Sequence, residues 1–462
     1  MKTSAISSVI KSISDAVIGL GDKSALEGWK PMSASSAPLT PDEIKKFMKL
    51  VSNHRKSLNH LHVLAGQANA WKLEAAESTY LGSHSARACA VVRALRSKRV
   101  YASAAEIDAV VKALDVWTPL SETVNVVLAE KPKGGWRTIV VFGLRRIAQQ
   151  LIVRDLLDAL GIDSEFDFTR KNAGGEKAFI AKICKEIVDE RNWWFVADVK
   201  NCFPSLKAKH FDGLPIPEQI VRNVVFLPKC AKIRIYYPKE KSPHTSPDNL
   251  KQKLPSKSFL IRLVRQGLPT GAVVSPLLAR SLLGRELQGL GEKWDVARSS
   301  FVDDLAIGAW SQTDAKSAFD ALKTRLSLLP AGPLELHAKG PTFVSKKGFD
   351  VLGYRLLPGE GYGNNPVHVK PGAVRIERHK RKLAIKLSEA AKAGIDLNAV
   401  GEAYWKSWYA SQQAWTKVPG HSCLISWIAT QSYVQDFKAG IPMGQNAPIL
   451  GTMNHKKAGS GK

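Results

Sequence analysis

Two adjacent aspartates in an apolar setting place the strongest constraint on how this chain can fold. Asp303 and Asp304 interrupt the run Ser-Phe-Val-Asp-Asp-Leu-Ala-Ile over residues 300–307. Short apolar runs on both sides of an acidic pair predict a β-hairpin whose turn holds both carboxylates. Paired acids between apolar strands are costly unless a cation neutralises them. Their oxygen atoms are hard ligands that suit Mg²⁺.

A second acid follows another apolar strand, earlier in the chain. The run Trp194–Val199 delivers Asp198 at its end, and Phe203 follows five residues later. Two divalent ions roughly 4 Å apart, held by such carboxylates, can activate a 3′-hydroxyl and stabilise a leaving pyrophosphate. Taken one at a time, these acids are more simply explained as a surface Asp-Asp turn and an unrelated aspartate.

A glycine-containing loop lies between these two segments. Gly267 and Gly271 stand in Gln-Gly-Leu-Pro-Thr-Gly-Ala-Val-Val-Ser-Pro over residues 266–276, so the backbone there can approach a ligand closely. Ser275 is a candidate N-cap, with Pro276 as the first residue of a buried helix. A loop-to-helix junction without a special purpose is the alternative interpretation.

In this order, the three segments resemble motifs A, B and C of the reverse-transcriptase family. Those motifs read D-x-x-x-x-F/Y, G-L-P-Q-G-x-x-x-S-P and Y-V-D-D, and the resemblance covers about residues 121–420. It implies an α+β right-hand polymerase with fingers, a palm of antiparallel sheet backed by helices, and a helical thumb. It also implies an RNA-directed DNA polymerase that uses two Mg²⁺ ions, with Mn²⁺ as a substitute.

The resemblance assigns the catalytic centre residue by residue. Asp198 and Asp303 would be the principal metal ligands, Asp304 would support them, and the carbonyl of Val199 would also bind metal. The ring of Phe203 would lie under the incoming sugar, where it clashes with a 2′-hydroxyl, so that deoxynucleotides are favoured.

Further residues are expected on the nucleotide. The segment from Lys131 to Arg137 resembles the fingers hairpin, in which Lys131 or Lys133 together with Arg137 would hold the triphosphate by charge-assisted hydrogen bonds. A solvated basic hairpin is the alternative. Three more candidates follow from the resemblance: Thr270 and Gly271 in motif B, and Lys339, a possible proton donor to pyrophosphate that could also be a surface lysine.

Contacts to nucleic acid are expected from three places. Arg145 and Arg146 would contact template phosphates or support the fold. The Val-Leu-Gly-Tyr segment resembles the primer grip, which implicates Leu352, Gly353 and Tyr354. Residues 370–390 predict a thumb helix with one cationic face and one apolar face. The cationic face consists of Arg375, Arg378, Lys382 and Lys386, and the apolar face of Ile376, Leu383 and Leu387.

The chain divides into regions of different character. Thr40, Pro41 and the acids after them predict a helix start, and Ser103 with Glu106 predicts a second one. The expected domains are a helical N-terminal extension (1–120), fingers (121–195), a palm (196–360) with a basic fingers-like insertion (207–262), a helical thumb (361–435) and a flexible basic tail (436–462).

Composition bounds the partners. The formal net charge of +26 favours a polyanion, most simply nucleic acid, and 44% hydrophobic residues can fill a sizeable core. The sequence contains no run of about 18 consecutive apolar residues, which is the length that a membrane-spanning helix requires. The five cysteines form no Cys-x-x-Cys pair, which argues against a zinc site or a disulfide framework and fits a cytoplasmic location.

The absence of several sequence features indicates which subgroup of reverse transcriptases the chain resembles. Too few residues follow the thumb for an RNase H domain, and no Cys/His cluster indicates an intron endonuclease. The marks of retron and diversity-generating enzymes are also lacking. The chain is most similar to the bacterial unknown-group, defence-associated reverse transcriptases, which include abortive-infection enzymes. That similarity implies an RNA template, in particular a structured non-coding RNA, deoxynucleoside triphosphates as substrates, a DNA product and a role against phage. The oligomeric state is open, and a homo-oligomer is compatible with the sequence.

Thr270 is a departure from the family pattern, because the family has Gln at this place in motif B. The shorter side chain would alter nucleotide selection or dependence on a template. An untemplated or protein-primed DNA polymerase is therefore an alternative, and a retired polymerase fold that binds RNA is another. An RNA-dependent RNA polymerase fits less well, because Phe203 and Val302 favour DNA synthesis.

Overall fold

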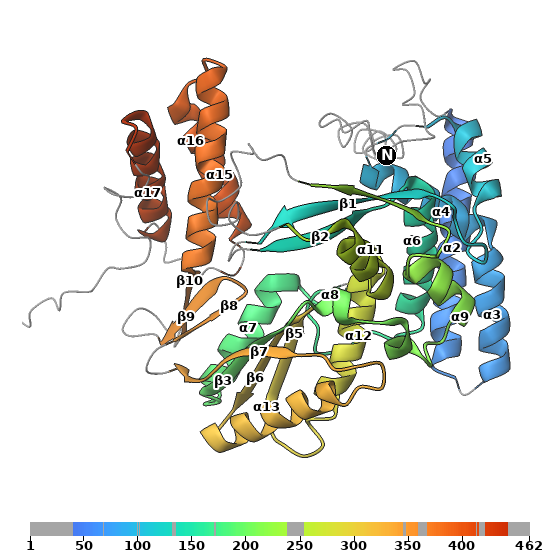
Figure 1. The fold of residues 1–462 in the computed structure, drawn as a ribbon, viewed down its shortest axis with the longest axis horizontal. Helices are drawn as coiled ribbons and strands as arrows, with labels where there is room; N and C mark the ends of the chain where they lie inside the picture. Colours follow the sequence, from blue (N-terminus) through green and yellow to red (C-terminus); the bar gives the residue numbers. More distant parts are fainter. Residues whose placement is uncertain are drawn as a thin grey trace, which may run out of the picture. The chain divides into compact units, whose positions relative to one another are not determined.

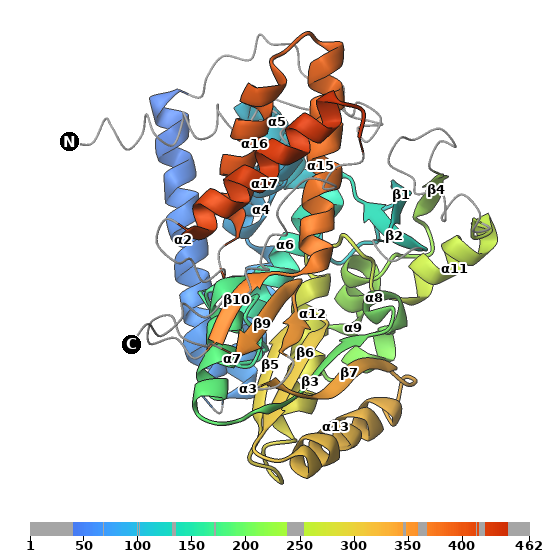
Figure 2. The same ribbon diagram turned by 90° about the vertical axis from the view of Figure 1, so that its left-hand side faces the viewer.

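The computed structural model describes residues 40–67, 69–98, 102–131, 135–170, 172–237, 254–344, 348–358, 367–412 and 421–441, with Val100 and Ala414 between them. The chain, whose helices and strands are drawn in Figures 1 and 2, forms two compact units, each built from several stretches of sequence. Unit 1 contains residues 1–165, 199–286 and 324–336, and unit 2 contains residues 166–198, 287–323 and 337–462. Helices and three small sheets make up the described residues, which confirms the predicted α+β class.

Some sequence predictions lie outside the described residues. They concern the first 39 residues of the N-terminal extension, the middle of the basic insertion (238–253), Lys133, and the tail from residue 442. The backbone of Lys339 is described, but its side chain is not.

Unit 1 begins with a group of packed helices. They are α2 (Pro41–Ala65), α3 (Ala70–Gly82), α4 (His84–Lys98), α5 (Ala104–Ala113) and α6 (Leu144–Ala159). Thr40 and Glu43 form a capping box at the start of α2, and Ser103 and Glu106 form another before α5, so both predicted helix starts are confirmed. Helix α4 packs on α2, α5 and α6, and its small buried residues allow this close packing.

Unit 1 also contains a three-stranded mixed sheet. Strands β1 (Thr123–Glu130) and β2 (Trp136–Val141) pair antiparallel, which confirms the predicted hairpin. Strand β4 (Lys232–Tyr236) then pairs parallel to β1, giving the order β2-β1-β4. Alternate residues of β1 point into the core, as expected for a sheet with one buried face.

Unit 1 contains further helical segments of different lengths. They are α8 (Cys202–Ser205), η2 (Ala208–Phe211), α9 (Glu218–Ile220), η3 (Val221–Val225), α11 (Lys257–Gln266) and α12 (Ser275–Gln288), whose last two residues belong to unit 2. Helix α12 begins at Ser275, one residue earlier than predicted. The Ser275 hydroxyl donates to the Pro269 carbonyl at 3.0 Å and so holds the preceding loop.

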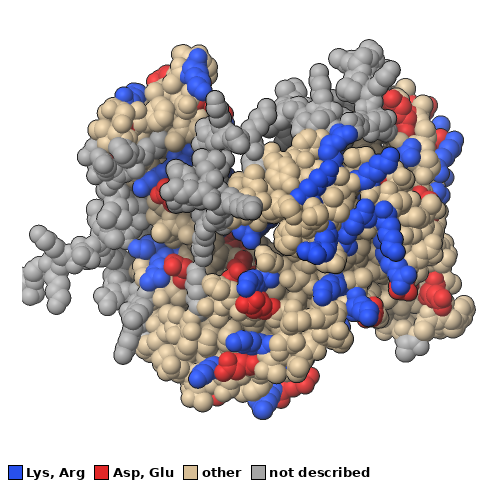
Figure 3. Space-filling model, in the orientation of Figure 1, with Lys and Arg blue, Asp and Glu red and all other residues tan. Residues whose placement is uncertain are grey.

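One face of unit 1 is strongly basic. Figure 3 shows Lys and Arg side chains gathered over β4 and α11. The exposed cations of these two elements are Lys232, Arg234, Lys257 and Arg262. Arg265 differs from them, because its guanidinium donates to the carbonyls of Pro228, Lys229 and Ala231. It ties α11 to the segment before β4.

Unit 2 is built around a four-stranded sheet. Strands β3 (Trp193–Val199), β5 (Ala297–Phe301), β6 (Asp304–Ala309) and β7 (Leu336–Phe343) lie in the order β5-β6-β3-β7. Both faces of this sheet are covered. Trp194 packs with residues of α7 (Gly175–Val188) in one core cluster, whereas Phe195 stacks on Phe319 of α13 (Gln312–Ser327) at 4.4 Å. Alternation along β3 therefore sends successive aromatic rings to opposite faces.

A smaller antiparallel sheet and three helices follow. Strands β8 (Phe349–Val351), β9 (Tyr354–Pro358) and β10 (Val367–Pro371) share a core cluster with α7 and the larger sheet. Helices α15 (Ala373–Lys392), α16 (Leu397–Ser411) and α17 (His421–Lys438) pack around Leu383, Leu387 and Trp408. Across the described ranges, no helix has the combination of length and apolar character needed to cross a bilayer.

Candidate active site

Unit 2 contains the predicted β-hairpin, but its turn holds only Asp303, because Asp304 is already the first residue of β6. Strands β5 and β6 pair antiparallel, with Phe301 opposite Asp304, and Val302 and Asp303 form the two-residue turn between them. Strand β3 pairs with the other side of β6, and this register places Asp198 opposite Asp304. The three acids therefore lie at one end of β3 and β6, next to Val199, the last residue of β3.

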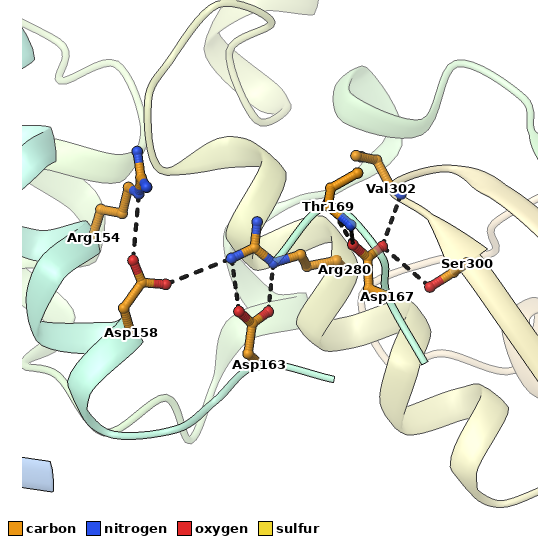
Figure 4. Close-up of polar contacts among 8 residues, drawn as sticks. All are labelled: Arg154, Asp158, Asp163, Asp167, Thr169, Arg280, Ser300 and Val302. Carbon is orange, nitrogen blue, oxygen red and sulfur yellow. Dashed lines mark hydrogen bonds and ion pairs between the residues drawn. The ribbon is translucent and has the colours of Figure 1, made fainter. Parts of the chain in front are cut away.

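The turn of this hairpin has an unfavourable backbone conformation. Val302 has a φ of +60°, in the left-handed region, where a β-branched side chain is strongly disfavoured. Such a conformation costs on the order of 1–3 kcal/mol and persists only when neighbouring groups hold it. Here the Val302 N–H donates to the carboxyl group of Asp167 at 2.8 Å (Figure 4).

Asp167 is a functional candidate that the sequence analysis missed. It is fully buried between Phe166 and Phe168, close in space to a turn about 135 residues later in the chain. The only local signal was an acid between two aromatic residues, which is ambiguous because an exposed acid gives the same pattern.

His337 is a second residue that was missed. Its Nδ1 lies 3.4 Å from Oδ1 of Asp198, and the two side chains are 67% and 54% exposed. Sequence analysis singled out Lys339 in this segment, whose side chain lies outside the described residues. Because β7 pairs directly with β3, strand pairing brings His337 beside Asp198, which no local pattern could indicate.

The donors fit hard divalent cations. Carboxylate oxygens are the ligands that Mg²⁺ prefers, and like charges directly opposite each other on neighbouring strands are destabilising without a counterion. Asp198 and Asp304 are in that position. Within the part of the chain that the structure describes, no three His, Cys, Asp or Glu side chains already lie close enough to hold one ion. The fit therefore depends on donor chemistry and strand register.

Unit 1 brings several of the predicted nucleotide-binding residues together. Lys131 Nζ donates to Oδ1 of Asn201 at 3.3 Å, two residues before Phe203 in α8. The loop from Gly267 packs directly on α8, because a Cβ on Gly267 would lie only 2.4 Å from the Pro204 carbonyl oxygen. Phe203 itself is partly buried. Glycine is required at 267 to allow this contact.

The same loop is also fixed to β2 and α6. The Val140 N–H donates to the Thr270 carbonyl at 2.7 Å, and Gln150 accepts from the Val273 N–H at 3.1 Å. Gly271 has a φ of +108°, and a Cβ there would meet the Val140 carbonyl oxygen at 2.5 Å. Backbone contacts thus hold Thr270 and Gly271 in place. Arg137, which was also predicted to bind the nucleotide, is exposed on β2.

Arg146 requires a correction. It was expected on nucleic acid or in support of the fold, and its side chain is fully buried. Nε donates to Glu122 at 2.9 Å and Nη1 donates to the carbonyl of Asn223. Burial raises the pKa of Glu122, although Arg146 acts in the opposite direction. Arg146 supports the fold, whereas its neighbour Arg145 is exposed.

The predicted primer grip also needs a correction. Tyr354 is fully buried, and Arg375 is largely occupied by protein contacts. The Arg375 guanidinium donates twice to the Leu352 carbonyl, forms an ion pair with Glu176 at 2.6 Å and lies 4.0 Å over the Tyr354 ring. Tyr354 and Arg375 therefore hold the Leu352–Gly353 turn, and they do not present themselves to a ligand.

The remaining cations of the predicted thumb face are available. Arg378, Lys382 and Lys386 are exposed on α15, while Leu383 and Leu387 are buried on the opposite side. The predicted division of this helix into two faces is confirmed for these residues.

Comparison of the sequence with protein-family models and with curated proteins finds no match.

Proposed function

We propose that this chain is an RNA-directed DNA polymerase that adds deoxynucleotides by two-metal phosphoryl transfer. The observation that carries the proposal is the register that places Asp198 opposite Asp304, with Asp303 in the adjoining turn. An independent support is the sequence resemblance of these segments, and of the loop at 267–271, to reverse-transcriptase motifs.

Each residue has a defined role in this proposal. Asp198 and Asp303 would hold the two ions, with Asp304 in support. When bound, Mg²⁺ or Mn²⁺ would supply activation of the primer 3′-hydroxyl and charge neutralisation of the leaving pyrophosphate. Lys131 and Arg137 would donate to triphosphate oxygens, and the Phe203 ring would exclude a 2′-hydroxyl.

The partners in this proposal are polyanions. An RNA template, in particular a structured non-coding RNA, and the DNA product would lie on basic surfaces such as that of β4 and α11. Resemblance to bacterial defence-associated enzymes extends the proposal to anti-phage defence. Purifying the protein from its native host and sequencing the bound RNA and any DNA product tests both parts.

One observation favours a second candidate function. Thr270 replaces the family's glutamine, and its backbone is tied to β2 by the hydrogen bond from Val140. An untemplated or protein-primed DNA polymerase would tolerate this change. Adding defined RNA templates separates the two candidates, because only a templated enzyme gives a product whose sequence follows the template.

The central test removes one carboxylate. Asp303→Asn keeps the size of the side chain but removes its charge, so we expect deoxynucleotide incorporation to fall by at least about 100-fold, equivalent to about 3 kcal/mol. Primer extension with Mg²⁺ measures it, and circular dichroism checks that the variant is folded. Asp212→Asn, at an exposed carboxylate after η2, is the matched control and should retain activity. Wild-type incorporation by folded Asp303→Asn would refute the metal assignment.

A further inference from the structure

The segment around Asp167 forms an additional strand pairing beside β5. Asp167 and Ser300 form a parallel β-bridge. The Ser300 N–H donates to the Phe166 carbonyl at 2.8 Å, and the Phe168 N–H donates to the Ser300 carbonyl at 3.0 Å. Strand β5 is at the edge of its sheet, so this pairing covers an otherwise open strand. It also brings a carboxyl group next to the turn that follows β5.

Four hydrogen bonds saturate this buried carboxyl group (Figure 4). Oδ1 accepts from the N–H of Thr169 at 2.7 Å and from the Thr169 hydroxyl. Oδ2 accepts from the Ser300 hydroxyl at 3.1 Å and from the Val302 N–H at 2.8 Å. A carboxylate has about four acceptor sites, so Asp167 has no capacity left to bind a metal itself.

The bond to Val302 has a particular consequence. Val302 is held at a φ of +60°, which its β-branched side chain resists, and the next residue is Asp303. If this turn relaxed, the backbone that carries the Asp303 carboxylate would rotate with it. The groups that hold the turn therefore determine where that carboxylate lies.

We propose that Asp167 is a positioning residue that locks the strained Val302–Asp303 turn and thereby sets the place of the Asp303 carboxylate. The effect on metal binding rests on the proposed function, whereas the effect on the turn does not. Asp167 acts through the Val302 N–H and touches neither substrate nor metal. If Asp167 only accepted hydrogen bonds from donors in the core, replacing it would leave the conformation of the Val302–Asp303 turn unchanged.

The test compares variants of the full-length protein. Asp167→Ala removes every side-chain contact, and Asp167→Leu, which has a branched side chain without an acceptor, serves if the alanine variant fails to fold. Ser300→Ala is the matched control, because it removes a donor from the same oxygen and leaves the Val302 bond intact. Val302→Gly removes the strain, so it should make the turn less dependent on Asp167.

Hydrogen–deuterium exchange over residues 298–305 is the first measurement. We expect exchange at least about tenfold faster in both Asp167 variants and within about threefold of wild type in Ser300→Ala. The effect of Asp167→Leu should be smaller when Val302 is glycine. Unchanged protection in a folded Asp167→Leu variant overturns the inference, whatever the metal does.

Mn²⁺ titration is the second measurement, and Asp303→Asn is its reference. We expect Asp167→Leu to weaken Mn²⁺ binding by at least about tenfold, with partial recovery in the Asp167→Leu, Val302→Gly double variant. Unaltered Mn²⁺ affinity in Asp167→Leu, together with loss of binding in Asp303→Asn, overturns the role in setting the carboxylate. An unaltered Mn²⁺ affinity in Asp303→Asn refutes the proposed metal site. Hydrogen–deuterium exchange alone then decides whether Asp167 holds the turn.

Discussion

Phe203 lies in the short helix α8, and the backbone of the next residue, Pro204, is packed against Gly267. The backbone that carries the Phe203 ring therefore cannot shift to admit a bulkier sugar without disturbing packed atoms, which costs about 1–3 kcal/mol. If the ring lies under the sugar, as proposed, this corresponds to roughly 5- to 150-fold discrimination against ribonucleotides. Phe203→Val should remove most of that discrimination, which competition between deoxynucleotides and ribonucleotides in primer extension would measure.

The control for this prediction is another aromatic residue on the same unit. Phe259 is 44% exposed on α11, and Phe259→Val should leave sugar selection unchanged. Equal incorporation of both sugars by the wild-type protein would contradict the role proposed for Phe203 and favour the RNA-polymerase alternative.

Single residues also show where sequence reasoning ends. Asp198 and Asp303 could be predicted because the apolar strands around them are local. Asp167 and His337 could not, since each acquires its role from a strand paired with it at a long distance in the chain. Arg146 could not be separated from Arg145, because the partner that makes burial tolerable, Glu122, lies 24 residues away.

Among the elements, helix α15 was predicted most completely. A period of 3.6 residues separates its apolar and cationic faces, and the structure places Leu383, Leu387 and Lys382 accordingly. Arg375 is the exception, because it lies in the first turn, where the β8–β9 turn and Glu176 are within reach. The pairing of β4 with β1 was not predicted, since parallel partners far apart in sequence leave no local pattern.

The same helix contains a buried histidine with a consequence for acid stability. His379 is 1% exposed and packs among the rings of Tyr404, Trp408 and Tyr433, with the Thr430 hydroxyl 3.4 Å from Nε2. Burial and, to a smaller extent, the positive charge of nearby Lys380 together lower the pKa of His379 to about 4. The folded protein therefore resists protonation at a site that the unfolded chain protonates near pH 6.5.

We expect unfolding of α15–α17 to become easier as the pH falls from about 6.5 to about 4, because only the unfolded chain takes up this proton. The loss would approach about 3 kcal/mol. His379→Phe keeps an aromatic ring in the stack and removes the titration. Urea unfolding monitored by tryptophan fluorescence, which Trp405 and Trp408 report, should show a smaller acid loss in this variant. An equal loss in both proteins would contradict the prediction.

At the scale of the whole molecule, the chain has 67 Lys and Arg against 41 Asp and Glu, a net charge of +26. This charge should favour binding to a polyanion such as nucleic acid. Phosphate neutralisation releases counterions, so affinity for nucleic acid should fall steeply between low and physiological salt. Total charge alone would produce some dependence on salt. The question is whether the exposed cations of α15 make specific contacts.

Replacing Arg378, Lys382 and Lys386 together by Gln removes three exposed charges from one face of α15 and leaves its buried side intact. If each contacts a phosphate, the slope of log affinity against log salt should fall by up to about three. Fluorescence anisotropy with a primer–template duplex over a salt series measures this slope. The matched control replaces Lys45, Lys46 and Lys49, three exposed lysines of α2, and so removes the same charge elsewhere. Equal slopes for both triple variants would mean that net charge, and not the face of α15, governs binding. A flatter slope for the α15 variant alone would locate the duplex on that helix.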